Sequence, residues 1–162
     1  MNPLEERAVL PFYLEMMGLN APANAAALWD ELVVAGNALT ITDAKWLLNV
    51  GAWRPVVMGA WFSTQFPAAH IGSELKRAMG TSKGSLTAPP LAAACTAVVG
   101  VDALPVMGEY VETDPGRDGS TRVVAAGIEH LGGSPAVAPM DDDRKAFQDL
   151  LSVAVRLRSW VA

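Results

Sequence analysis

The residues that could carry chemistry are few in this chain, and their spacing matches no known site. His70 and His130 are the only histidines, and Cys95 is the only cysteine. They lack the short His and Cys spacings of zinc sites, and the acids lack the spacing of a calcium loop. Segment 80–85 contains two glycines but not the Gly-Lys-Ser/Thr ending of a phosphate-binding loop. We therefore expect no metal ion and no cofactor.

Cys95 is the one candidate for a nucleophile, yet its sequence neighbours argue against that role. A reactive thiol needs a base and an electropositive opening, whereas Cys95 stands between Ala94 and Thr96 in an apolar run. A single cysteine cannot form an internal disulfide, which suits a reducing cytoplasm. We expect a buried, unreactive thiol, and we predict that the protein is not an enzyme.

The strongest surface signal is a cluster of acidic residues in segment 102–118. Arg117 is the only basic residue in this segment. The acids could simply keep the surface soluble, or they could form a docking face for a basic partner protein. Besides Asp102, the segment holds the four residues that we predict to bind the partner: Glu109, Glu112, Asp114 and Asp118.

Two other charged groups could either bind a ligand or stabilise helices. The acids at 141–143 stand at a predicted helix start, where negative charge is favourable against the helix dipole, so we favour capping over a cation site. Arg54 and Arg122 open two helices that look equivalent. We favour an ion pair for each over ligand binding, and Asp118 or Asp102 could serve Arg122.

Composition limits the classes of partner. The net charge is -5, from 17 acidic and 12 basic residues, which disfavours a nucleic acid held through its phosphates. No apolar run approaches the roughly 20 residues that cross a bilayer, and the first residues lack the pattern of a signal peptide. We expect a cytoplasmic protein that does not bind membranes.

The pattern of apolar residues predicts an all-α protein. Apolar residues recur at helical spacing, and no segment alternates with a period of two. With 162 residues, 51% of them hydrophobic, the chain can bury the core of a single domain, 1–162. We expect more than half of the residues to be helical. A first helix starts at residue 3 and breaks near Pro11, and the others are expected at 12–17, 25–34 (capped by Asn24), 44–50, 52–65, 67–79, 87–99, 102–112, 120–131 and 142–160.

One short pattern recurs along the chain. Arg54 and Gly59 are followed 68 residues later by Arg122 and Gly127, which is twice a 34-residue step. The middle step falls on an Ala-rich helix without the Arg. Glycine inside a helix costs about 1 kcal/mol relative to alanine unless packing compensates. We therefore expect Gly59 and Gly127 to lie where two helices approach closely.

The segment from Val99 to Gly132 resembles one HEAT-like α-hairpin repeat. It contains a Gly stop, an Asp before an apolar helix with an early Pro, an acidic Gly-rich turn, and a small-residue helix behind Arg122. The resemblance implies a short stack of antiparallel helix hairpins over 52–160, pairing 52–65 with 67–79 and 87–99 with 102–112. The N-terminal helices of 1–51 and the long C-terminal helix would cap the ends.

The resemblance also implies a function. Small, acidic, all-helical bacterial proteins of this kind are similar to immunity proteins that neutralise secreted toxins. We therefore expect a non-enzymatic protein-binding module, whose partner is a basic toxin domain. The alternatives are an enzyme on a HEAT-like scaffold, resembling a DNA glycosylase or a lyase, and an adaptor subunit of a larger complex.

Overall fold

A computed structural model of the chain describes residues 2–113 and 120–160. The described part is all-helical, with eleven α-helices, 73% helix and no strand. The prediction of an all-α fold with more than half helix is therefore confirmed. The helices are α1 (Pro3–Ala8), α2 (Tyr13–Met16), α3 (Ala21–Asn24), α4 (Trp29–Asn37), α5 (Ile41–Asn49), α6 (Trp53–Ser63), α7 (Ala68–Thr81), α8 (Ala88–Val98), α9 (Leu104–Thr113), α10 (Ser120–His130) and α11 (Asp141–Ser159), and a 3-10 turn, η1 (Gly100–Ala103), precedes α9.

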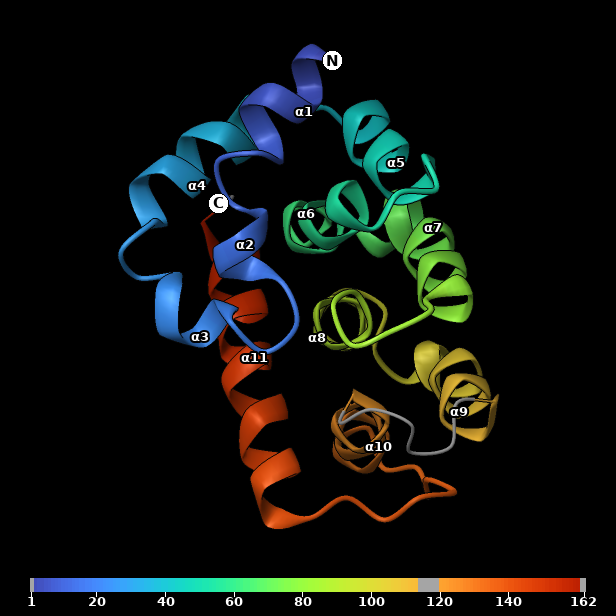
Figure 1. Ribbon diagram of the computed structural model, residues 1–162. Helices are drawn as coiled ribbons and strands as arrows, with labels where there is room; N and C mark the ends of the chain where they lie inside the picture. The colour runs from blue at the N-terminus through green and yellow to red at the C-terminus, as the bar shows by residue number, and fades with distance from the viewer. Residues whose placement is uncertain (1, 114–119, 161–162) are drawn as a thin grey trace.

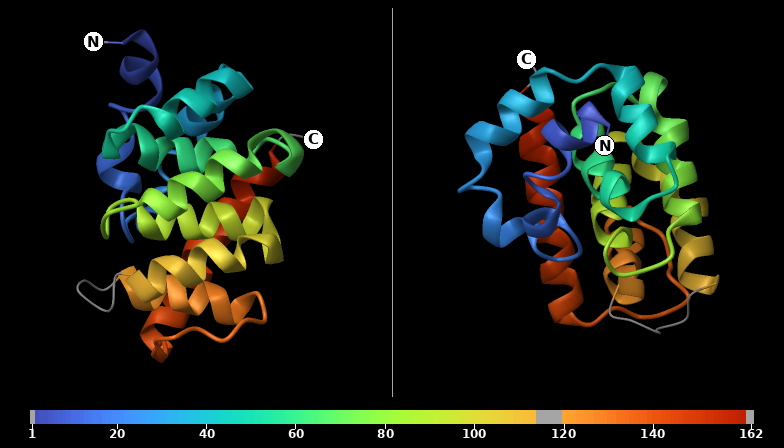
Figure 2. Two further views of the ribbon diagram at one scale, coloured as in Figure 1. Left: turned by 90° about the vertical axis from the view of Figure 1, so that its right-hand side faces the viewer. Right: turned by 45° about the horizontal axis from the view of Figure 1, so that its top comes forward.

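Six of the helices form two adjoining columns. In Figure 1, α6, α8 and α10 are seen nearly end-on in a central column, with α5, α7 and α9 in a second column beside it. Figure 2 shows the same helices from the side as successive rows. The shorter helices α1 to α4 lie along the top and left of the molecule in Figure 1, where α2 packs against α6 and α3 packs against α11.

The sequence had suggested that the long C-terminal helix caps an end of the stack, and this prediction is wrong for α11. It runs along the side of the central column and packs against α6, α8 and α10. Its 19 residues correspond to a length of about 28 Å, enough to cross three rows of helices. A buried stripe from Phe147 to Leu157 faces those rows. This helix therefore joins the layers to one another.

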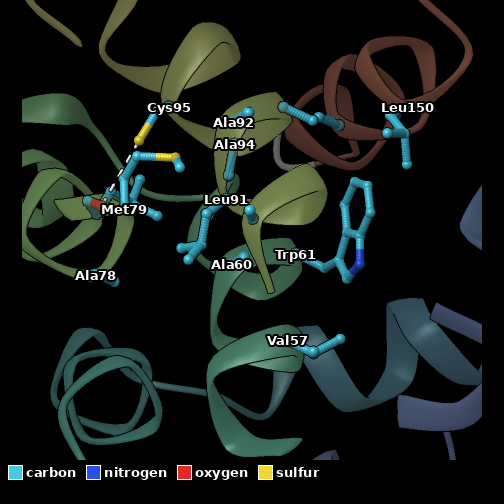
Figure 3. Packing of buried hydrophobic residues seen from close by; sticks show 14 of the residues in the cluster. Val57, Ala60, Trp61, Ala78, Met79, Leu91, Ala92, Ala94, Cys95 and Leu150 are labelled. Carbon is cyan, nitrogen blue, oxygen red and sulfur yellow. Dashed lines mark hydrogen bonds between the residues drawn. The ribbon is translucent and has the colours of Figure 1, made fainter. Parts of the chain in front are cut away.

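Helix α8 is the centre of the core. It packs against α6, α7, α10 and α11, and every residue from 88 to 96 is buried. Its many alanines keep the helix narrow, so that its neighbours can approach closely. Pro89 and Pro90 stand in the first turn, where the missing N–H groups are not needed. Figure 3 shows Met79 of α7 on one side of α8 and Leu150 of α11 on the other.

The helices pair differently from the hairpins expected from the sequence. Among helices that follow one another in the chain, the most extensive packing is between α5 and α6, α7 and α8, and α9 and α10. The expected pairs were α6 with α7 and α8 with α9, so the predicted pairing is wrong by one helix. The physical reason is that α6 and α8 are apolar on almost all sides. Periodicity alone cannot say which neighbour along the chain covers such a helix.

Capping residues explain where several helices begin. The Asn2 side chain accepts a hydrogen bond from the Leu4 N–H at the start of α1. Thr40 and Asp43 form a reciprocal capping box at the start of α5. The expected cap at Asn24 is wrong, because this residue ends α3 and its amide donates to backbone oxygens that precede it. Helix α4 begins only at Trp29.

The two glycines of the recurring pattern both lie at close helix contacts, as predicted. A Cβ atom at Gly59 would lie 3.0 Å from Cβ of Leu47 in α5. At Gly127 it would lie 2.7 Å from Met107 Cε in α9 and 2.8 Å from Phe147 Cε1 in α11. Gly127 thus sits where three helices meet.

Candidate functional site

Helix α9 carries two of the four acids predicted to bind a partner. Glu109 and Glu112 are both exposed, and their spacing of three residues places them on one face of the helix. Asp102 is also exposed, in the turn that precedes α9. Asp114 and Asp118 lie outside the described residues. We call Glu109 and Glu112 the acidic face of α9.

Glu112, one of the two residues of the acidic face, lies at the end of α9 where negative charge is least favourable. The C-terminal end of a helix carries a partial negative charge, and cations there are stabilising by about 0.3–1 kcal/mol each. Glu112 lies in the last turn of α9, and this turn contains no basic residue. Helix α11, by contrast, has the favourable arrangement, with three acids in its first turn and Arg156 and Arg158 in its last. The helix dipole and the carboxylates of α9 therefore add to one negative field.

Arg54 and Arg122 have different surroundings. The Arg54 guanidinium lies over the rings of Trp53 and Tyr13, 4.6 and 5.3 Å from their centroids. Arg122 lies 3.9 Å from the Met140 sulfur. The ion pair suggested between Arg122 and Asp118 falls outside the described residues. Within the described part, Arg54 makes a cation–π contact where an ion pair was expected.

The acids at the start of α11 stabilise the helix, as expected. Asp143 accepts a hydrogen bond from the Met140 N–H at 2.8 Å and so caps the helix. Asp141 pairs with Arg144 at 2.9 Å, and Arg144 also pairs with Glu129 of α10 at 3.0 Å. The hydrogen bond from Arg144 lowers the pKa of Glu129. This cluster fastens α11 to α10.

Cys95 is buried in the core, as predicted. Its Sγ lies 3.6 Å from the carbonyl oxygen of Leu75, and this contact is the dashed line in Figure 3. Burial raises the pKa of the thiol to about 12, so the nucleophilic thiolate is disfavoured. His70 and His130 are both exposed. Within residues 2–113 and 120–160, no three His, Cys, Asp or Glu side chains gather as a metal site would require.

A groove that the sequence did not reveal lies where three segments meet. We call it the 77–83 groove. Its volume is about 590 Å³, and it lies between the α5–α6 connection, the end of α7 and the α7–α8 connection. Two cations line it, together with an aromatic ring and several polar side chains. Its lining includes Asn49, Trp53, Arg77, Ser82, Lys83 and Thr87.

Two other grooves differ from it in charge. One, of about 400 Å³ between α3 and α11, contains Asp149 and Arg156. The other, of about 540 Å³ between α1 and α4, contains Arg7 and two acids, Asp30 and Glu31. The 77–83 groove contains Arg77 and Lys83 and no carboxylate among its lining residues.

The sequence missed this groove because its residues are far apart along the chain. Lys76 and Arg77 are adjacent cations on α7, and the loop after α7 is polar, so neither feature by itself indicates a binding site. Helix α6 carries two tryptophans, Trp53 and Trp61, that could fill the core. Only Trp61 does so, with its Nε1 donating to the Met16 carbonyl at 2.9 Å, whereas Trp53 is half-buried and lines the groove.

None of the helices in the described ranges is both long and apolar enough to cross a membrane. Comparison with known protein families, with curated proteins and with solved structures gave no match.

Proposed function

We propose that this chain is a helical protein-binding module that docks a basic protein through the acidic face of α9. In its most specific form, the chain is an immunity protein that neutralises a cognate bacterial toxin. The observation that supports this is that Glu109 and Glu112 are both exposed on one face of α9, with Glu112 in the last turn, at the negative end of the helix. Carboxylates placed against the helix dipole lower stability. Departures from a local rule of this kind concentrate at functional sites.

The proposal includes a HEAT-like arrangement of the helix pairs. The three helices of the central column, α6, α8 and α10, each have 11 residues. Gly59 and Gly127 occupy similar places in α6 and α10, and each lies against the helix that precedes it in the chain. In this version the repeat unit is an outer helix followed by a central one. Such stacks present extended surfaces to partner proteins.

The acidic face would act mainly on the rate of encounter. Complementary charges steer association and raise the association rate more than they slow dissociation. A basic active site or surface on a toxin would be drawn to α9 and then covered. Asp114 and Asp118, which come after α9 in the sequence, are the other two residues of the proposed docking face.

The direct test is co-expression with a secreted toxin encoded beside the gene for this chain. The proposal predicts that the chain protects cells from the toxin and co-purifies with it. The charge-reversed variant Glu109→Lys/Glu112→Lys should lose much of that protection. A matched control, Asp30→Lys/Glu31→Lys, changes the net charge equally on α4, away from α9, and should still protect.

The outcomes separate the proposed functions. Protection that survives the α9 reversal would contradict the acidic face as the docking site. The absence of any protein partner, together with turnover of a small molecule or of DNA, would favour the enzyme alternative.

A further inference from the structure

We propose that the 77–83 groove binds a small organic anion that carries a flat apolar group, such as an aryl phosphate or an aryl carboxylate. The inference is independent of the docking role of α9. It depends on three features of the groove: an excess of hydrogen-bond donors, an aromatic wall held in a fixed orientation, and the absence of carboxylates among its lining residues.

The polar lining offers more donors than acceptors. A guanidinium has five N–H donors and an ammonium has three, and neither accepts a hydrogen bond. Arg77 uses one donor on the side-chain oxygen of Asn49, so most of its N–H groups are free of that contact. The Ser82 and Thr87 hydroxyls bond to each other at 2.6 Å, and that contact uses only one of their two protons. An anion is the ligand that satisfies such a set.

The contact with Asn49 also positions Arg77. It joins the end of α5 to the exposed outer side of α7, and so restrains a long side chain that would otherwise sample many rotamers. Restraint of this kind lowers the entropy cost of binding. Asn49 therefore acts as a positioning residue for the cation.

The apolar wall of the groove is built around Trp53. The Tyr13 ring packs edge-on against it, with centroids 5.7 Å apart and an interplanar angle of 77°. The Arg54 guanidinium lies 4.6 Å from the centroid of the same ring. These contacts hold the indole in place, and Val56, one turn further along α6, continues the wall. A flat apolar group can pack against such a surface.

The size and charge of the groove agree with this class of ligand. Its volume of about 590 Å³ lies within the roughly 300–1,000 Å³ of small-molecule sites. The whole chain carries a net charge of -5, yet this groove is lined by two cations and no acid. An anion would meet a local positive field there.

Calorimetric titration with four probes tests the inference. Phenyl phosphate and benzoate combine an anion with a flat ring, phenol has only the ring, and inorganic phosphate has only the anion. We expect phenyl phosphate or benzoate to bind at one site, and phenol and inorganic phosphate to bind at least about tenfold more weakly. The comparison of phenyl phosphate with benzoate identifies the preferred anion.

Variants locate the binding in the groove. Arg77→Gln and Lys83→Gln should each weaken binding of the better probe by about tenfold, because a charge-assisted hydrogen bond is lost. Trp53→Leu should weaken it as well. Lys76→Gln removes a cation from the same helix but outside the groove and should leave the affinity unchanged. Equal melting temperatures for the Arg77, Lys83 and Lys76 variants would show that folding is intact.

Three results would overturn the inference. The first is no heat of binding with either aryl anion at millimolar concentration. The second is phenol binding as tightly as phenyl phosphate and benzoate, which would make the groove merely apolar. The third is equal weakening by Lys76→Gln and Arg77→Gln, which would indicate unspecific attraction to positive charge.

Discussion

Replacement of Gly127 by leucine tests the packing of three helices at once. A single Cβ atom at this position would already lie 2.7 Å from Met107 Cε and 2.8 Å from Phe147 Cε1. The methionine end can move, but the Phe147 ring is fully buried and has little room. Leucine adds three more carbon atoms beyond that Cβ.

The expected magnitude follows from two opposing effects. Replacing glycine by a good helix former stabilises the helix by up to about 1 kcal/mol. Overpacking a filled core costs about 1–3 kcal/mol and occasionally more. Because even the first added atom has no space, we place the cost at about 3 kcal/mol or more, and after the helix-propensity gain we expect a net loss of about 2 kcal/mol or more. For a chain of this length, each 1 kcal/mol lowers the melting temperature by roughly 2–4 °C.

The assay is thermal unfolding followed by far-ultraviolet circular dichroism. Gly108→Ala is the matched control, because nothing lies within 4 Å of a Cβ at Gly108 in the neighbouring helix α9. This control should stabilise the protein by about 0.5–1 kcal/mol. Phe147→Leu in the Gly127→Leu background should recover part of the loss through coupling. A neutral or stabilising Gly127→Leu, with Gly108→Ala behaving as expected, would refute the close approach.

Three further predictions concern local features. Thr40→Ala removes the side-chain half of the capping box and should lower the free energy of unfolding by about 1 kcal/mol in a denaturant titration, whereas an unchanged value would show that the box is not stabilising. The pKa of Glu129 is below its ordinary value of 4.5 because Arg144 donates to it, so the stability from this pair is present above the unfolded-state pKa and is lost as the pH falls through the folded-state pKa. Arg144→Gln should therefore raise the pKa of Glu129 in an NMR titration, and an unchanged pKa would contradict the stated cause. Cys95, whose pKa is raised to about 12 by burial, should react with a thiol reagent at mildly alkaline pH only after unfolding, and rapid labelling of the native protein would show that the core opens there.

Local signals in the sequence predicted the helices better than their arrangement. Helix α5, expected at 44–50, spans Ile41–Asn49, and such ends can be predicted to within a few residues because caps such as Thr40 and Asp43 depend on near neighbours. The long helix α11 was likewise clear from its acids and its apolar stripe. The segment of α3 and α4 was predicted poorly. Asn24 is a residue type that often caps helices, but its side-chain amide donates to carbonyl oxygens that precede it in the chain.

The sequence pattern could not predict which helices pack against one another. Helix α8 is apolar on nearly all sides, so its periodicity does not indicate which helices cover it. The 77–83 groove forms where α5, α6, α7 and the loop after α7 come together. No short sequence motif predicts that these segments are neighbours. The acids of α9 were visible in the sequence. The helix expected at 102–112 already placed Glu112 near its C-terminal end, and the bounds of α9 agree with that position.

The proposal that the acidic face steers a basic partner is tested most directly by association rates measured at several salt concentrations. With the toxin immobilised, the parent chain should associate fast at low salt and about tenfold more slowly after Glu109→Lys/Glu112→Lys, with little change in dissociation. The difference should shrink as the screening length falls from about 10 Å at 0.1 M to about 3 Å at 1 M salt. Equal association rates for the two proteins at low salt would contradict the account.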